Sequence, residues 1–505
     1  MSFRTARELI AALRSREASA VELFEDAVAR IERYDGQTNA VVIRDFERAR
    51  RAAKEADDAL SRGERRPLLG VPMTVKESFN VAGLPKTWGV PGTENLEITE
   101  DAVAVRRLKQ AGAVILGKTN VPTMLNDWQT YNRIYGVTNN PWDLTRTPGG
   151  SSGGSAAALA AGFVPLELGS DIGGSLRVPA HCCGIYAHKP THGLIPMRGA
   201  APPGTPMLSV NIDPDLAVVG PMARSAGDLA LALDVLAGPD DMQATGYRLD
   251  LPPPRHIRLA DFRVLMLEDH PDATLSNDVR SAMQRFRKHL QGAGCVVATG
   301  SALLPDLSLM MRTFSQLLLS FSGAGLPPEE YRSLQVLAAG LSSDDTSPAA
   351  VELRNVVLGH RDWIAADRTR VAQMHRWRQL FREWDLVVCP VLPIAAFVHD
   401  HSDMRSRHIE VDGRQVAYTE QAAWQSLATM VGLPATAFPI GLGDTGLPIG
   451  LQAIGPYLED HTPIAFAELV ESEFGGLYAA TRVRRCMMLC TGPDSSKGKP
   501  LLKAS

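Results

Sequence analysis

Short apolar runs alternate with helical patterns along most of the 505-residue chain. From about Leu69 onward, runs rich in β-branched residues are separated by segments with a helical apolar period, such as Ala102–Ala111. The candidate strands are Val71–Val75, Ala113–Leu116, Phe163–Leu168, Arg263–Leu267, Cys295–Ala298 and Leu386–Cys389. Because continuous apolar runs are typical of strands covered on both faces, this alternation predicts an α/β fold with a largely parallel, buried sheet.

Three segments are expected along the chain. Residues 1–62 have the pattern of helices, and Ser19 with Glu22 three residues later predicts a capping box at the start of one of them. Residues 63–480 carry the alternating pattern and form the main domain. Residues 481–505 lose periodicity and are basic, which predicts a disordered terminal tail.

The composition is that of a globular chain with balanced charge. Lys and Arg number 52 and Asp and Glu number 56, so no basic excess favours nucleic acid as a partner. Six cysteines are too few for a disulfide framework, which fits a reducing compartment. The first residues lack the apolar core of a signal peptide. The sequence also has no apolar stretch of about 18 residues, so it predicts no membrane-spanning helix. We therefore expect a cytoplasmic protein. Its expected state is a monomer or homodimer, and its expected partner is a small molecule.

Two glycine–serine clusters stand out between Thr147 and Thr191, separated by a helix-like segment and an apolar strand. Flexible linkers often have this composition, but linkers do not lie between buried apolar segments. Glycines at the end of a strand let the backbone approach a ligand, and adjacent N–H groups in such a turn bind an anion. A serine beside these donors suits acyl transfer, because the donors stabilise the oxyanion. The segment therefore predicts a hydrolase-like site.

A serine nucleophile needs a base, and the residues leave that choice open. His181, His188 and His192 are near in sequence, but no spacing directs one of them toward Ser175. Lys76 ends an apolar run and could act as the base if burial kept it neutral. A lysine at the end of a strand is more often a solvated charge, so the segment alone does not decide.

Several segments together resemble the amidase signature family. They are GVPMTVKESFNVAG (70–83), GKTNVPTM (117–124), NNPWDLTRTPGGSSGGS (139–155) and the segment 149–191. The similarity continues through GPMARSAGDLALALDVLAG (220–238), GLPATAFPIG and LPIGLQAIGP, and covers roughly residues 5–478. The resemblance implies an α/β/α sandwich around a large mixed, mainly parallel sheet. It also implies amide hydrolysis without a metal or organic cofactor, with residues 63–480 as the amidase signature domain.

The resemblance assigns a role to individual residues. The family uses a Ser–cis-Ser–Lys triad, in which Lys76 matches the base, Ser151 the bridging serine and Ser175 the nucleophile. The backbone N–H groups expected to form the oxyanion hole are those of Ile172, Gly173, Gly174 and Ser175. The residues expected to support these loops are Ser152, Asp171 and Arg177. The sequence departs from the family at Glu77-Ser78, often Asp-Asn, and at His181-Cys182-Cys183, but it keeps every triad member.

Three other motifs match known patterns that we do not favour. Gly112–Thr119 fits the phosphate-loop pattern, but its four middle residues are themselves a strand-like run. His188 and His192 flank a proline and cannot form a helical metal-binding pair. Gly149–Gly153 fits the nucleophile elbow of α/β-hydrolases, which would make Ser151 the nucleophile with a downstream histidine. The histidines available for that role are His256, His289 and His360. This interpretation leaves the second cluster, around Ser175, unexplained.

The expected substrates are hydrophobic acyl or aryl amides, with esters and carbamates as further candidates. Acyl and amine pockets are expected on loops at Pro196–Leu208 and Leu304–Leu341, and apolar side chains in Leu303–Phe321 suit either core packing or a substrate wall.

Three competing functions remain open at this point. One is that of the A-type amidotransferase subunit, which releases ammonia from glutamine in a tRNA-modifying complex. That subunit binds the glutamine amino group with an acid shortly before its GLPA motif, and Ala422–Val431 contains none. The second is an esterase built on Ser151, and the third is a catalytically silent binding protein.

Overall fold

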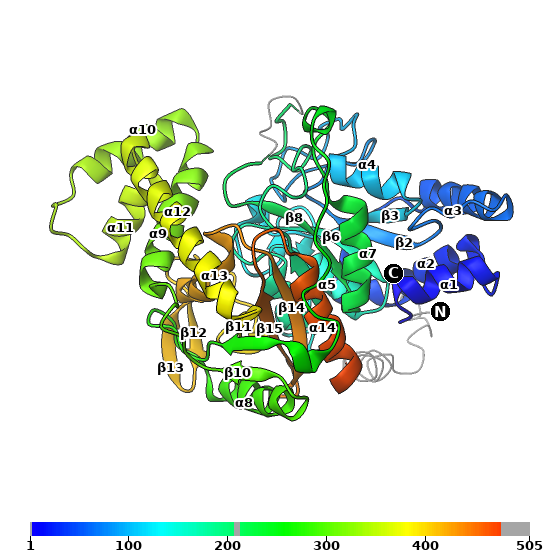
Figure 1. Ribbon diagram of the computed structural model, residues 1–505. Helices are drawn as coiled ribbons and strands as arrows, with labels where there is room; N and C mark the ends of the chain where they lie inside the picture. Colours follow the sequence, from blue (N-terminus) through cyan, green and yellow to red (C-terminus); the bar gives the residue numbers. More distant parts are fainter. Residues whose placement is uncertain (1–2, 207–212, 476–505) are drawn as a thin grey trace, which may run out of the picture.

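An eleven-stranded mixed sheet runs through the molecule and carries helices on both faces (Figure 1). The computed structural model describes residues 3–206 and 213–475. The strand order is β1-β3-β2-β6-β8-β7-β14-β15-β11-β9-β10. These strands are β1 (Val41–Arg44), β2 (Pro72–Lys76), β3 (Val114–Thr119), β6 (Leu166–Asp171), β7 (Tyr186–Lys189), β8 (Val218–Ala223), β9 (Arg263–Met266), β10 (Val296–Ala298), β11 (Leu386–Pro390), β14 (Ala435–Leu442) and β15 (Pro448–Ile454). The predicted α/β/α sandwich is therefore confirmed.

Two parallel blocks lie on either side of an antiparallel centre. Strands β3, β2 and β6 pair in parallel, as do β11, β9 and β10. Antiparallel pairs join the two blocks through β8, β7, β14 and β15. Two short hairpins lie outside this sheet, β4–β5 (Tyr131–Asn132, Gly136–Val137) and β12–β13 (His408–Val411, Arg414–Ala417). All six candidate strands are found, with bounds shifted by up to three residues.

Side chains of the sheet alternate between two cores. On β3, Ile115 points into one core, whereas Val114 and Leu116 point into the other. The helices of the first core are α4 (Val103–Gln110), α7 (Ala226–Leu236), α8 (Asn277–Gly292) and α14 (His461–Phe474). Those of the second are α2 (Ala20–Thr38), α3 (Phe46–Ser61), α5 (Gly153–Ala160) and α6 (Arg177–Cys183), while α1 (Ala6–Ser15) contributes to both. Because both faces are covered, the strands carry the unbroken apolar runs seen in the sequence.

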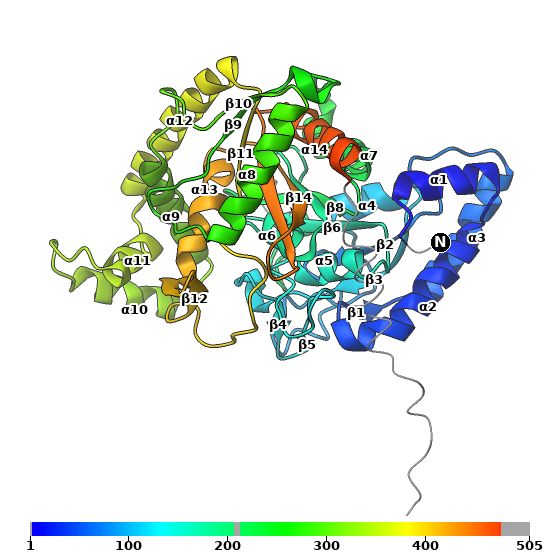
Figure 2. The same ribbon diagram turned by 90° about the horizontal axis from the view of Figure 1, so that it is seen from below.

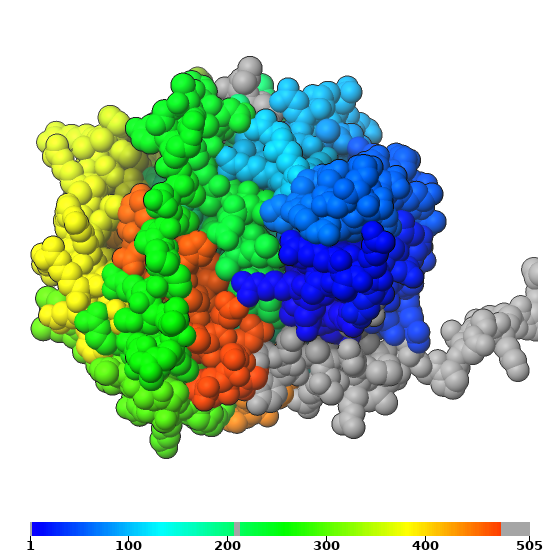
Figure 3. All heavy atoms as spheres, turned by 45° about the vertical axis from the view of Figure 1, so that its right-hand side comes forward, coloured from blue at the N-terminus to red at the C-terminus, as the bar shows by residue number. Residues whose placement is uncertain are grey.

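The N-terminal segment is not helical throughout, contrary to the expectation for residues 1–62. The capping box of Ser19 and Glu22 is confirmed at the start of α2. However, Val41–Arg44 forms β1, which pairs antiparallel with β3 at the edge of the sheet. The Asp35 carboxylate accepts from the N–H of Ala40 and from that of Val41, so it fixes the turn between helix and strand. The N-terminal helices pack directly on the main body (Figure 3). The predicted tail, 481–505, lies outside the described residues.

The expected pocket loop at Leu304–Leu341 is largely helical. It contains α9 (Leu307–Ala324) and α10 (Pro328–Ala339), and α10 projects from the body together with α11 (Pro348–Val356) (Figures 1 and 2). On α9, Met310, Phe314 and Leu317 are buried in a third apolar cluster with α12 (His360–Glu383) and α13 (Ala422–Thr429). These three residues of the predicted stripe therefore serve core packing, whereas Phe321 at its end is exposed. Within 3–206 and 213–475, no helix is both long and apolar enough to cross a membrane.

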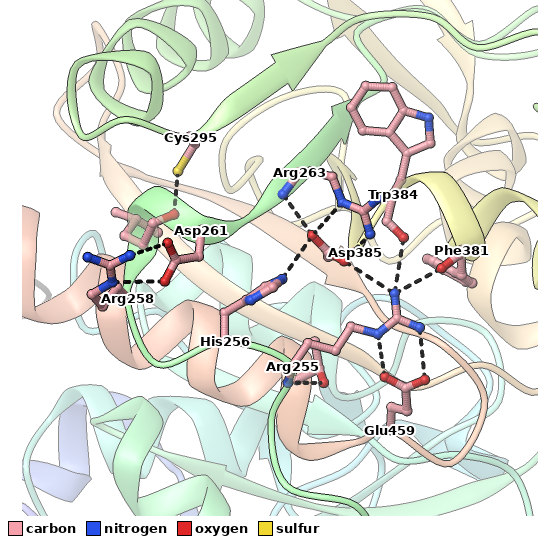
Figure 4. A network of polar contacts seen from close by, with 12 residues as sticks. Arg255, His256, Arg258, Asp261, Arg263, Cys295, Phe381, Trp384, Asp385 and Glu459 are labelled. Atoms are coloured by element: carbon pink, nitrogen blue, oxygen red, sulfur yellow. Dashed lines mark hydrogen bonds and ion pairs between the residues drawn. The ribbon is translucent and has the colours of Figure 1, made fainter.

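An ion network fixes the chain where it enters β9. Asp385 accepts Arg263 Nη2 at 2.7 Å and Arg255 Nη1 at 3.3 Å, and His256 Nε2 lies 3.2 Å away (Figure 4). Arg255 also forms a bidentate pair with Glu459, with distances of 2.6 and 2.9 Å. Two arginines and a histidine thus share the Asp385 carboxylate, whose side chain is 1% exposed. The network ties the parallel block β9–β11 to the segment before α14.

Candidate active site

Lys76 is the last residue of β2 and lies fully inside the molecule. Its Nζ atom donates to Ser151 Oγ at 2.8 Å and to Ser170 Oγ at 3.0 Å. Burial removes water from the ammonium group and lowers the pKa of Lys76 to about 7, although the negative charge of Asp171 opposes the shift. Lys76 is therefore not the solvated surface lysine that its place at a strand end suggests.

The loop that carries Ser151 needs its two preceding glycines. The peptide bond between Gly150 and Ser151 is cis. Gly149 has a φ of +83°, and a Cβ atom there would lie 2.7 Å from the Cα of Pro179. A Cβ atom on Gly150 would lie 2.5 Å from the carbonyl oxygen of Asp127. Only residues without a side chain fit between these backbone segments, so the glycines set the position of Ser151 opposite Lys76.

Ser175 lies in the turn between β6 and α6 and is 7% exposed. Its carbonyl oxygen accepts the N–H of Ser152 at 3.2 Å, which joins this turn to the loop of Ser151. Ser152 Oγ also donates to the Ser170 carbonyl at 3.3 Å. The fold therefore gathers Lys76, Ser151 and Ser175 from three segments far apart in sequence, at the ends of the neighbouring strands β2 and β6.

Asp171 and Arg177 stabilise the turn that carries Ser175. The Asp171 carboxylate accepts from the N–H of Gly174 at 2.8 Å and from that of Leu176 at 3.0 Å. It also pairs with Nε and Nη2 of the Arg177 guanidinium. Burial alone would raise the pKa of Asp171, but the charge and hydrogen bonds of Arg177 outweigh it and hold the pKa at about 2. Asp171 is therefore ionised over the working pH range and braces the turn.

The expected set of oxyanion donors needs one correction. The N–H of Gly174 already donates to Asp171, so it does not point at a substrate. Among the residues that the structure describes, the N–H groups of Ile172, Gly173 and Ser175 have no protein acceptor. Unused backbone donors beside a serine are the arrangement that binds a developing oxyanion. The sequence alone could not separate these donors, because neighbouring N–H groups in a turn point in different directions.

Several residues of the site were not expected from the sequence. The hydroxyl and the carbonyl of Ser170 lie beside Lys76, and Trp128 Nε1 donates to the Gly173 carbonyl at 2.7 Å. Arg177 also donates to three groups of the C-terminal half, which belong to Gln425, Thr429 and Gln452. Ser170 could have been predicted, because it stands directly before Asp171 in the sequence. No sequence pattern points to Trp128 or to the C-terminal residues.

The neighbouring histidines are engaged elsewhere. The two ring nitrogens of His181 lie 3.0 Å from the Gly450 carbonyl and 2.9 Å from that of Ile394. His188 lies between Thr436 and Asp460. In the described part of the chain, no hydrogen bond joins a histidine to Ser151 or Ser175. The phosphate-loop match is a strand, because Val114–Thr119 forms β3.

The sequence profile of the Amidase family matches residues 22–463. The chain is 32% identical to the indoleacetamide hydrolase of Bradyrhizobium diazoefficiens over 90% of this chain and 84% of that protein. It is 33% identical to the A-type subunit of the glutamyl-tRNA(Gln) amidotransferase of Anaeromyxobacter dehalogenans over 94% of this chain and 96% of that one.

A solved structure of a bacterial aryl acylamidase has the same fold. It superposes with a TM-score of 0.79 at 22% identity and covers 99% of each chain. The profile match spans most of the chain, and both relatives share more than 30% of their residues with it. The chain therefore belongs to the amidase signature family and is an amide hydrolase.

Proposed function

We propose that the protein hydrolyses amides with hydrophobic acyl or aryl groups through an acyl-enzyme on Ser175. The observation that carries the proposal is the buried contact of 2.8 Å between Lys76 Nζ and Ser151 Oγ. A lysine with a pKa of about 7 is largely neutral in mildly alkaline solution and can accept a proton there. Lys76 is thus a base next to Ser151, and the N–H of Ser152 joins the loop of Ser151 to the turn of Ser175.

The reaction proceeds in two stages. Neutral Lys76 takes the proton of Ser151 Oγ while Ser151 takes that of Ser175 Oγ, and Ser175 Oγ attacks the carbonyl carbon. The oxyanion is received by the N–H groups of Ile172, Gly173 and Ser175. Ser151 then gives a proton to the leaving nitrogen and regains one from the charged Lys76, and the C–N bond breaks. Water repeats the attack on the acyl-enzyme, and the carboxylic acid leaves.

The apolar character of the site comes from residues beside the nucleophile. Ile172 and Trp128 are half-buried and lie against the third apolar cluster. Of the expected wall at Leu303–Phe321, Met310, Phe314 and Leu317 are core residues. Leu303, Leu304, Met311 and Leu318 are partly buried against the same cluster as Trp128 and Ile172. The name of the indoleacetamide hydrolase relative describes an amide with an aromatic acyl group, which supports the same substrate class here. Of the second expected apolar group, Pro202, Pro203 and Pro206 lie on a described loop, whereas Met207 and Leu208 lie outside the described residues.

The amidotransferase function remains a candidate because a relative of 33% identity has that name. We disfavour it because α13, which fills Ala422–Thr429, is buried and carries no carboxylate. A glutamine amino group would lack a counter-charge there. The esterase function built on Ser151 is disfavoured because Ser151 contacts Lys76 rather than a histidine.

A substrate series tests the apolar preference. We expect kcat/KM for p-nitroanilides to rise with acyl length and to exceed that for acetamide or glutamine, because each Å² of buried apolar surface contributes about 25 cal/mol. A matched control is the adipoyl monoanilide beside the hexanoyl anilide, since a free carboxylate would be left unpaired. Activated esters and carbamates complete the series. Higher kcat/KM for acetamide or glutamine than for the long anilides would overturn the substrate class.

A further inference from the structure

The segment from Asp127 to Gln129 touches both loops of the proposed active site. A Cβ atom on Gly150 would lie 2.5 Å from the carbonyl oxygens of Asp127 and Gln129, so this segment packs against the residue before Ser151. Between them, Trp128 donates its indole N–H to the Gly173 carbonyl at 2.7 Å. One short segment therefore contacts the loop of the bridging serine and the loop of the oxyanion donors.

The peptide group between Gly173 and Gly174 is held at both ends. Its carbonyl accepts Trp128 Nε1, and its N–H donates to Asp171 Oδ1 at 2.8 Å. Because a peptide group is planar, its C=O and N–H point in opposite directions, and this group cannot rotate without breaking one of the two bonds. The free N–H groups of Gly173 and Ser175 belong to the peptide groups on either side. With the central plane fixed, these two neighbouring groups can turn only about the φ and ψ angles of Gly173 and Gly174.

Trp128 is itself anchored by buried groups. Its ring lies 5.4 Å from that of Tyr418, whose hydroxyl donates to Asp127 Oδ1 at 2.7 Å. Arg407 Nη1 lies 3.0 Å from both oxygens of Asp127, and the Arg407 guanidinium lies over the Tyr418 ring. Arg407 and Tyr418 flank the β12–β13 hairpin. The residues that flank the hairpin thus hold the Asp127 side chain, and the Tyr418 ring packs against the Trp128 indole.

We infer that Trp128 is a positioning residue for hydrolysis, which fixes the oxyanion donors by holding the Gly173 carbonyl. The inference rests on the proposed function, because it concerns the donors that serve Ser175. Donors that are already oriented stabilise the transition state without reorganisation, so their orientation affects kcat more than substrate binding. Trp128 does not donate to the substrate, and its effect passes through the peptide group that it holds.

Trp128→Phe keeps a ring of similar position and removes the N–H. We expect kcat to fall roughly 10- to 100-fold, less than for loss of a direct oxyanion donor, with KM within about threefold of wild type. A trifluoromethyl ketone that forms a tetrahedral adduct should bind more weakly by the same factor as the fall in kcat/KM. The pH at which activity rises should not move. The matched control is Trp142→Phe, whose indole N–H donates to the Cys183 carbonyl at 2.9 Å and not to the turn of Ser175.

A second variant keeps the shape of the side chain. Replacing the Trp128 indole by benzothiophene removes only the N–H, and the same fall in kcat supports the inference even if Trp128→Phe is unstable. Unchanged kcat in this variant, or an equal fall in Trp142→Phe, would overturn it. In both Trp128 variants a serine-directed phosphonate should still label Ser175, only more slowly. Failure of Ser175 to be labelled in the wild-type protein would instead overturn the proposed function.

Discussion

Replacing Ser175 with alanine is expected to lower kcat by about four to six orders of magnitude. The covalent stage cannot form without the hydroxyl, and only binding and the backbone donors remain to assist attack by water. The fold should survive, because the contact that Ser175 makes to Ser152 uses its backbone carbonyl, which alanine keeps. Turnover of a long-chain p-nitroanilide measures the loss, and the thermal unfolding temperature should stay close to that of wild type.

Ser151→Ala provides the comparison. In the proposed mechanism it also slows turnover strongly, because the proton path from Ser175 to Lys76 passes through its hydroxyl. The two variants separate the competing assignments. Near wild-type turnover in Ser175→Ala, together with an inactive Ser151→Ala, would make Ser151 the nucleophile and support the esterase function.

Lys76→Ala is expected to remove most of the rate and the pH dependence with it. The charged lysine cannot accept a proton, so only the neutral form is active. Because the pKa of Lys76 is lowered to about 7, kcat/KM should rise with pH through a limb near neutrality and then reach a plateau. In Lys76→Ala the residual rate, lower by several orders of magnitude, should lack this limb. The measurement is kcat/KM between about pH 5 and pH 10 in buffers of constant ionic strength.

Lys189 offers a matched control for this pH profile. It is also buried, and burial lowers the pKa of Lys189 to about 7, but its Nζ donates to the Pro190 carbonyl rather than to a serine. Lys189→Met should therefore keep the limb. A limb that persists in Lys76→Ala, or that disappears only in Lys189→Met, would assign the titration to another group and remove Lys76 as the base.

Much of the fold is predictable because apolar runs report burial directly. The runs around β2, β3, β9, β10 and β11 predict strands, since strands covered on both faces are rich in apolar residues on both sides. The strand Val41–Arg44 escapes prediction because its four residues stand between two strong helical patterns and end in a charged residue. The expectation of loops in Leu304–Leu341 is wrong because it follows the expected place of a pocket, whereas the apolar spacing of this segment is helical.

The sequence predicts which residues form the site, but not the directions in which their backbone N–H groups point. The resemblance assigns roles to Lys76, Ser151 and Ser175, and the structure brings their segments together. The resemblance cannot reveal that the N–H of Gly174 donates to the Asp171 carboxylate, because that hydrogen bond depends on the rotation of one peptide group. Nor can it reveal Trp128, whose contact with Gly173 joins residues 45 positions apart. Contacts of this kind depend on tertiary packing, which no local pattern encodes.

Labelling with a serine-directed phosphonate, followed by peptide mass spectrometry, tests the central claim most directly. The account predicts one adduct per chain, on Ser175, in wild-type protein. It predicts no adduct in Ser175→Ala, and slow labelling of Ser175 in Lys76→Ala. An adduct on Ser151 in the wild-type protein, or labelling that is unchanged in Ser175→Ala, would contradict it.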